Sequence, residues 1–153
     1  MRDCVYITDY AYEREEVLGM ESMILVALDY QIFVPTGFHF LSRYLNCIQA
    51  SERLRNLASY YAERNLQEFD MLSTTPHRFA AAAIYAALRQ GARTGPGAWC
   101  SALQQESGLS EADVLPCAQL LIKHVKEEPE TASKRCLIAC KKKFSHDRFL
   151  KAS

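Results

Sequence analysis

The stretch that decides the fold is T-P-H-R-F-A-A-A-A-I-Y-A-A-L-R-Q-G, residues 75–91. Thr75 before Pro76 is the pattern of a helix N-cap followed by proline at the first helical position. Gly91 stands where a glycine commonly ends a helix. Alanine is the strongest helix former, and the four alanines at 80–83 allow neighbouring helices to approach closely. The stretch therefore predicts a central helix that other helices surround.

Apolar residues continue at helical spacing on both sides of this stretch. The predicted helices cover residues 13–29, 37–48, 51–68, 99–105 and 110–126, and a last helix lies between Pro129 and residue 144. No stretch alternates as a paired strand would, so residues 5–9, V-Y-I-T-D, are expected to form a turn of helix or an extended lead-in. The chain is thus predicted to be all-α, with about seven helices arranged around residues 75–91.

Three local signals refine these helices. Ser110, followed three residues later by Asp113, is a weak capping box at the start of a helix. Pro116 falls in the second turn of the same helix, where proline can bend the chain. Pro35 disfavours helix in the residue before it, so residues 30–34 are predicted to be an extended linker.

The composition limits the kinds of partner to expect. The chain has 153 residues, with 18 Lys plus Arg and 18 Asp plus Glu, so its zero net charge gives no reason to expect nucleic acid or a membrane. The basic end, residues 141–143 with Arg148 and Lys151, fits a solvated helix end. The first ten residues lack the apolar core of a signal peptide, and no stretch reaches the ~18 apolar residues of a membrane span. We expect a cytosolic or nuclear protein with reduced thiols.

Motifs for catalysis or metal binding do not stand out. The sequence contains no GxSxG, no HExxH and no GxxxxGK[ST]. Cys136 and Cys140 lie four residues apart on a predicted helix, but a metal site would need two further ligands, and the four histidines show no matching spacing. We therefore expect no enzyme activity, no metal or other cofactor and no small-molecule ligand.

The helix predicted near the start of the chain is unusually apolar. In Y-E-R-E-E-V-L-G-M-E-S-M-I-L-V-A-L, residues 12–28, a helical wheel shows two adjoining stripes. One stripe holds Leu18, Glu21, Leu25 and Leu28, and the other holds Val17, Met20, Ile24 and again Leu28. Two stripes imply two packing partners. The carboxylate of Glu21 either reaches water at the edge of a core or belongs to an interface with another protein.

The order of these residues resembles the cyclin family. Residues 5–45, V-Y-I-T-D-Y-A-Y-E-R-E-E-V-L-G-M-E-S-M-I-L-V-A-L-D-Y-Q-I-F-V-P-T-G-F-H-F-L-S-R-Y-L, are similar to the segment that joins the two cyclin boxes of A- and B-type mitotic cyclins. Residues 57–72 resemble the second helix of the C-terminal box, residues 75–88 its alanine-rich central helix, and residues 99–123 the two helices that follow. K-K-K-F-S-H-D-R-F-L-K-A-S, residues 141–153, resembles the family's ending.

A cyclin has two five-helix boxes, and the resemblance divides this sequence unequally between them. It implies that residues 1–33 hold the last helix of the N-terminal box and a linker, and that residues 34–153 form the C-terminal box. The remainder of the first box, including its substrate-docking patch and its kinase-binding lysine, has no counterpart in the sequence.

The resemblance also implies a function. It predicts a regulatory subunit, located in nucleus and cytoplasm, that binds and activates a cyclin-dependent protein kinase in mitotic control. The family's kinase contacts fall on Glu21, Leu25, Tyr30 and Ile32. Two alternatives stay open at this point: a truncated or degenerate cyclin-fold protein that does not activate a kinase, and a cyclin-fold transcription factor that binds nucleic acid.

Overall fold

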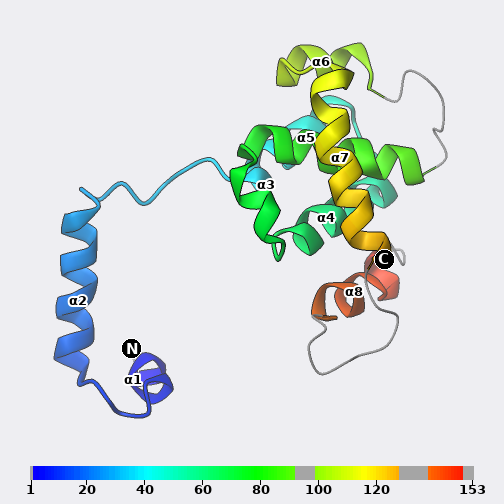
Figure 1. The fold of residues 1–153 in the computed structure, drawn as a ribbon. Coiled ribbons are helices and arrows are strands. Elements are labelled where there is room, and N and C mark those ends of the chain that lie inside the picture. Colours follow the sequence, from blue (N-terminus) through cyan, green and yellow to red (C-terminus); the bar gives the residue numbers. More distant parts are fainter. Residues whose placement is uncertain (1, 92–98, 128–137, 150–153) are drawn as a thin grey trace. The chain divides into compact units, whose positions relative to one another are not determined.

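The computed structural model describes residues 2–91, 99–127 and 138–149, and every regular element among them is helical. The chain divides into two compact units, Met1–Val34 and Pro35–Ser153. The first unit contains α1, Arg2–Ile7, and α2, Arg14–Ala27. The second unit (Figure 1) contains α3, Gly37–Cys47; α4, Glu52–Asn65; η1, Phe69–Ser73; α5, Pro76–Gln90; α6, Ser101–Ser107; α7, Glu111–Lys126; α8, Ala139–Phe144; and η2, Asp147–Phe149. The all-α prediction is confirmed for the described residues.

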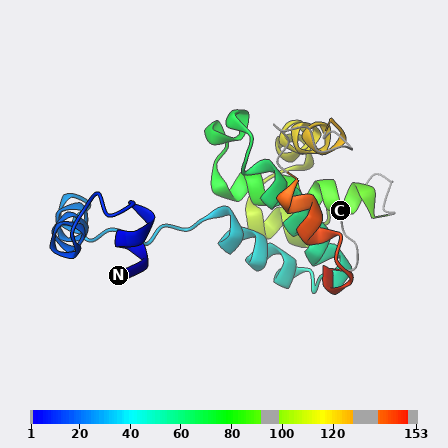
Figure 2. The ribbon, with the colours of Figure 1, turned by 90° about the horizontal axis from the view of Figure 1, so that it is seen from below.

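Helix α5 is the centre of the second unit, as its alanine-rich sequence predicts. Every residue from Phe79 to Ala87 is buried, and the alanines in this run have no exposed surface. Helices α3, α4, α6 and α7 all contact α5 (Figures 1 and 2). Because alanine side chains fill little space, the surrounding helices can approach the α5 backbone and supply the large side chains of the core themselves.

The large core side chains come from the helices around α5. They include Tyr44 and Leu45 of α3, Leu57 of α4, Leu103 of α6, and Val114 and Leu121 of α7. The indole Nε1 of Trp99 donates a hydrogen bond to the Leu109 carbonyl oxygen at 2.8 Å, which joins the two ends of α6. The turn after α6 requires Gly108, whose φ of 69° lies in the left-handed region where glycine has no Cβ penalty.

Several boundaries differ from the prediction. Helix α4 ends at Asn65 rather than near residue 68, and the short helix η1 that follows was not predicted. The side-chain amide of Asn65 donates to the Tyr61 carbonyl oxygen at 2.8 Å, a buried contact that no local pattern reveals. Gly91 does follow the end of α5, but its φ is −84°, so it does not use the left-handed conformation of a glycine cap.

The ends of the chain also refine the prediction. Of the two possibilities for residues 5–9, a helical turn is observed, because α1 extends to Ile7. The beginning of the last predicted helix and Cys136 lie outside the described residues, whereas Ala139–Phe144 is helical as expected. Cys140 is buried with its sulfur 4.0 Å from the Tyr60 carbonyl oxygen, so this thiol packs in the core.

Enlarging an alanine of α5 should destabilise the protein. Ala82→Leu places extra methylene groups where no exposed surface remains, and overpacking of this kind costs about 1–3 kcal/mol. The matched control is Ala112→Leu on the exposed face of α7, which should change the free energy of unfolding little. Urea denaturation of the two variants measures the difference, and equal effects would contradict a close-packed α5.

Helix α7 begins with the capping box that its sequence predicts. The Asp113 backbone N–H donates to Ser110 Oγ at 3.3 Å, and the Ser110 backbone N–H donates to Asp113 Oδ2 at 2.9 Å. The Ser110 hydroxyl also donates to Asp113 Oδ2 at 2.5 Å. These hydrogen bonds, the side-chain one first, hold the pKa of Asp113 below its usual value. The helix then continues through Pro116 to Lys126.

The lowered pKa of Asp113 predicts a pH dependence of stability. Because the folded state favours the ionised carboxyl, its contribution is present above the unfolded pKa and is lost as the pH falls through the folded pKa. Asp113→Asn should therefore destabilise the chain at neutral pH and lose this effect in acid. In a Ser110→Ala background the same substitution should have a smaller effect, which a double-mutant cycle followed by urea denaturation measures. Additive effects of the two substitutions would show that the box does not couple them.

Candidate protein-binding surface

The candidate surface is built on α2, whose start is defined by acidic residues. The backbone N–H of Glu13, the N-cap residue, donates to Glu16 Oε2 at 2.8 Å. Glu15 and Glu16 lie in the first turn, where negative charge is favourable beside the unpaired backbone N–H groups. Helix capping and the favourable position of negative charge in the first turn thus explain the acidic residues at the start of α2.

The end of α2 is a left-handed turn. Asp29 and Tyr30 have φ values of 50° and 56°, and the Tyr30 N–H donates to the Leu25 carbonyl oxygen at 2.8 Å. This hydrogen bond closes the helix in the manner of a Schellman motif. A bulky residue such as tyrosine rarely adopts this conformation, and such strain clusters at functional sites. The prediction of an extended linker from residue 30 is therefore wrong for Tyr30, because the turn includes it.

Helices α1 and α2 form an open groove of about 720 Å³. Its lining consists of two residues before α2 and six from α2: Cys4, Tyr12, Glu16, Val17, Met20, Glu21, Ile24 and Leu25. Members of both stripes of the helical wheel line the same groove, so the two stripes form one broad face. The Glu21 side chain is exposed, which means that its charge is solvated.

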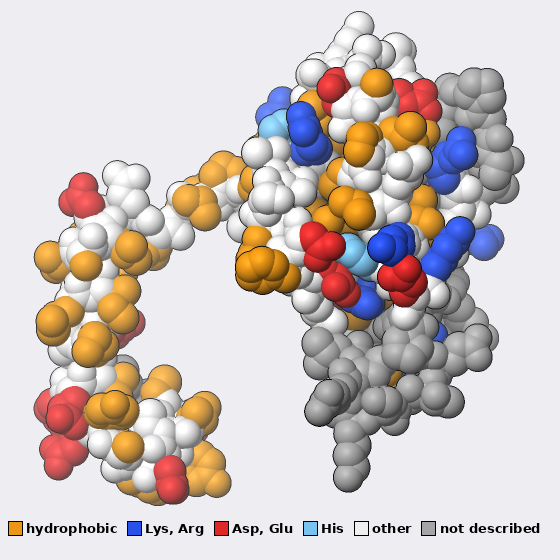
Figure 3. Space-filling model, viewed as in Figure 1, with side chains coloured by type: hydrophobic (Ala, Val, Ile, Leu, Met, Phe, Trp, Pro, Cys, Tyr) orange, Lys and Arg blue, Asp and Glu red, His pale blue; other side chains and the backbone are white. Residues whose placement is uncertain are grey.

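The first unit exposes much apolar surface. No residue of α2 is buried. Thirteen of the nineteen exposed large hydrophobic side chains among the described residues belong to residues 1–34. Figure 3 shows hydrophobic side chains along this unit, with acidic groups at the beginning of α2. A large exposed apolar surface is typical of a region that binds another protein.

The four residues predicted to contact a partner occupy this region. Glu21 and Leu25 lie one helical turn apart and both line the groove. Tyr30 and Ile32 follow at the end of the helix, with side chains 66% and 68% exposed. The backbone hydrogen bond from Tyr30 to Leu25 links the two pairs. All four are therefore accessible in part or in full on one unit.

Two features of this surface were missed by sequence reasoning. Cys4 and Tyr12 belong to the groove, but their contribution depends on α1 folding beside α2, and residues 5–9 gave no clear helical signal. The turn at Asp29 and Tyr30 lacks the glycine that usually marks a left-handed position. Among the described helices, none is both long and apolar enough to span a bilayer.

These features define a class of protein: the described residues form an all-helical domain and a separate unit whose helix α2 has an exposed apolar face. Residues 35–153 match the family model described as "Cyclin, C-terminal domain". The chain belongs to the cyclin family, whose members are non-catalytic regulatory subunits.

Relatives of this chain include B-type mitotic cyclins. It is 36% identical to Cyclin-B1-1 of Arabidopsis thaliana over 96% of this chain and 34% of the relative. It is 38% identical to G2/mitotic-specific cyclin-1 of Medicago sativa subsp. varia over 78% of this chain and 28% of the relative. It is 31% identical to G2/mitotic-specific cyclin-B of Dictyostelium discoideum over its whole length and 34% of the relative. The chain thus spans about a third of the length of such relatives.

Hydrogen exchange should separate α2 from the core helices. Helices α2 and α4 both have 14 residues, but α4 has buried side chains and α2 has none. A helix of this length is marginal in water without tertiary packing. We expect α2 amides in the isolated chain to exchange roughly a hundredfold faster than those of α4, measured by mass spectrometry of peptic fragments. Equal protection of the two helices would show that α2 is stabilised by packing that its exposure does not reveal.

Proposed function

We propose that this chain acts as part of a regulatory subunit that binds and activates a cyclin-dependent protein kinase in mitotic cell-cycle control. The observation that carries the proposal is the exposed apolar face of α2, which joins Glu21 and Leu25 on one groove in a member of the cyclin family. B-type mitotic cyclins among its relatives support the mitotic assignment. This role would place the protein in the nucleus and the cytoplasm.

Activation by such a subunit needs no catalytic group. A protein that binds the active conformation of a kinase more tightly than the inactive one shifts the population towards the active conformation. The extent of activation is limited by that difference in affinity. In this proposal the groove residues of α2 supply the differential contact, and apolar burial supplies most of the binding free energy.

The four predicted contact residues would each contribute a different kind of contact to kinase binding. Leu25 offers an apolar side chain that is already half-buried, so little conformational freedom remains to be lost when a partner covers it. Glu21 offers a solvated carboxylate beside it, which suits a lysine or arginine on the partner. Tyr30 and Ile32 extend the apolar contact beyond the helix end, and aromatic residues in such positions are frequent hot spots.

Substitutions in the groove should weaken kinase binding. Glu21→Ala and Leu25→Ala should each lower the affinity for a purified cyclin-dependent kinase by roughly tenfold, as expected of interface hot spots. Met23→Ala is the matched control, because Met23 is 66% exposed on the same helix but does not line the groove. Surface plasmon resonance measures affinity, and phosphorylation of a peptide substrate measures activation.

Three outcomes would contradict parts of the proposal. An unchanged affinity in the groove variants would remove Glu21 and Leu25 from the interface. Equal losses in all three variants would indicate an effect on the helix rather than on a defined contact. Kinase binding without any increase in phosphorylation would leave a cyclin-fold partner that does not activate.

A further inference from the structure

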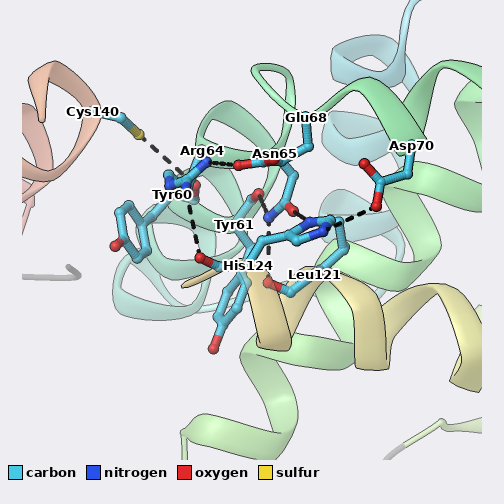
Figure 4. Close-up of polar contacts among 9 residues, drawn as sticks. All are labelled: Tyr60, Tyr61, Arg64, Asn65, Glu68, Asp70, Leu121, His124 and Cys140. Atoms are coloured by element: carbon cyan, nitrogen blue, oxygen red, sulfur yellow. Dashed lines mark hydrogen bonds and ion pairs between the residues drawn. The ribbon is translucent and has the colours of Figure 1, made fainter. Parts of the chain in front are cut away.

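A second polar cluster lies in the second unit, where the end of α4, the residues around η1, and α7 meet (Figure 4). Glu68, Asp70 and His124 each offer one ligand atom there, and these atoms lie within 4.8 Å of one another. None of these residues belongs to the groove formed by α1 and α2. The cluster therefore calls for an explanation other than partner binding by α2.

The buried side chain of Asn65 determines which ring nitrogen of a neutral His124 carries the hydrogen. Asn65 has no exposed surface, and its amide nitrogen donates to the carbonyl oxygens of Tyr61 at 2.8 Å and Leu121 at 3.5 Å. Its Oδ1 consequently faces His124 Nδ1 at 2.8 Å. An amide oxygen only accepts hydrogen bonds, so Nδ1 must carry the hydrogen. In the neutral imidazole the lone pair is then on Nε2.

The Nε2 atom of His124 faces a carboxylate oxygen. His124 Nε2 lies 3.4 Å from Asp70 Oδ2, and the His124 side chain is only 10% exposed. A charge-assisted hydrogen bond between a protonated ring and a carboxylate would be expected at about 2.7–2.9 Å. Two ligands on a tetrahedral zinc ion, at bond lengths of about 2.0–2.1 Å, lie about 3.3–3.4 Å apart. The observed separation is compatible with both atoms binding one ion.

We propose that His124, Asp70 and Glu68 form a binding site for a divalent transition-metal ion such as zinc. Asn65 holds the His124 ring in the orientation that directs Nε2 at the ion, as the outer hydrogen bonds of metal-bound histidines do. Asp70 is 60% exposed, so the ion has a path from solvent. Imidazole and carboxylate together are ligands that suit zinc.

The charges around the site favour a cation, although one neighbour competes with it. Glu68 is paired with Arg64, whose Nη2 also lies 3.4 Å from the His124 carbonyl oxygen. Two carboxylates and one guanidinium leave one net negative charge in the cluster when His124 is neutral. Glu68 must share its carboxylate with Arg64, which makes it the weakest of the three ligands. The ion would hold η1 against α7, because Glu68 and Asp70 lie at the start of η1 and His124 lies on α7.

The test uses the whole chain, with zinc and cobalt ions as probes. We expect zinc to raise the melting temperature of the wild type, and Asp70→Asn and His124→Asn to weaken binding by roughly tenfold or more. His146→Asn is the control, because His146 is exposed and outside the cluster. Isothermal titration calorimetry compares the zinc affinity, which should be lower in the Asp70 and His124 variants than in the wild type and in His146→Asn. Asn65→Leu should weaken zinc binding by removing the group that orients the ring.

Other results would overturn the proposal. If zinc changes neither the melting temperature nor the heat of the wild-type titration, the cluster is a histidine–carboxylate ion pair only. Cobalt absorption distinguishes the ligands, because a cobalt–thiolate charge-transfer band would assign the ion to a cysteine instead. Equal zinc affinity in the wild type, Asp70→Asn and His124→Asn would show that these residues do not bind the ion. None of these measurements involves a kinase, so their outcome is separate from that of the proposed function.

Discussion

The second unit depends on the burial of the middle of α5, from Phe79 to Ala87. Its core-facing run from Phe79 to Ala87 leaves almost no surface to solvent, and its small side chains allow four other helices to pack against it. The aromatic and branched side chains of those helices then fill the space between them. A larger residue at an alanine position would separate several helices at once, because close-packed interiors do not absorb added volume easily.

The first unit differs from the second in the burial of its main helix. Helix α2 buries no residue and exposes several apolar side chains, and a helix of 14 residues gains little stability without tertiary packing. The resemblance to the cyclin family identifies α2 with the last helix of the N-terminal cyclin box. The apolar groove and the left-handed turn at Tyr30 are the features of this unit on which the proposed kinase contact is based.

Buried polar side chains in the second unit need hydrogen-bond partners. Asn65 is fully buried and satisfies its amide through two backbone carbonyls and His124. This arrangement orients the imidazole ring, so that Nε2 faces the carboxylate of Asp70. A site of this kind can coexist with a protein-binding helix, because the two use different residues of the same chain.

The sequence by itself determined the helical class, the central position of residues 75–91 and the capping box at Ser110, since these depend on residues close in sequence. It also placed Glu21 and Leu25 on one stripe of a helix, because two residues four positions apart share a helix face, whereas their role as kinase contacts was implied by the family resemblance. Only the tertiary structure decided that Asn65 ends α4 and orients His124, which lies 59 residues away. It also decided that α1 completes the groove and that Tyr30 takes a left-handed turn without glycine. The orientation of His124 and the groove depend on contacts between separate segments, about which local propensity contains no information, and the turn at Tyr30 lacks the glycine that would have predicted it.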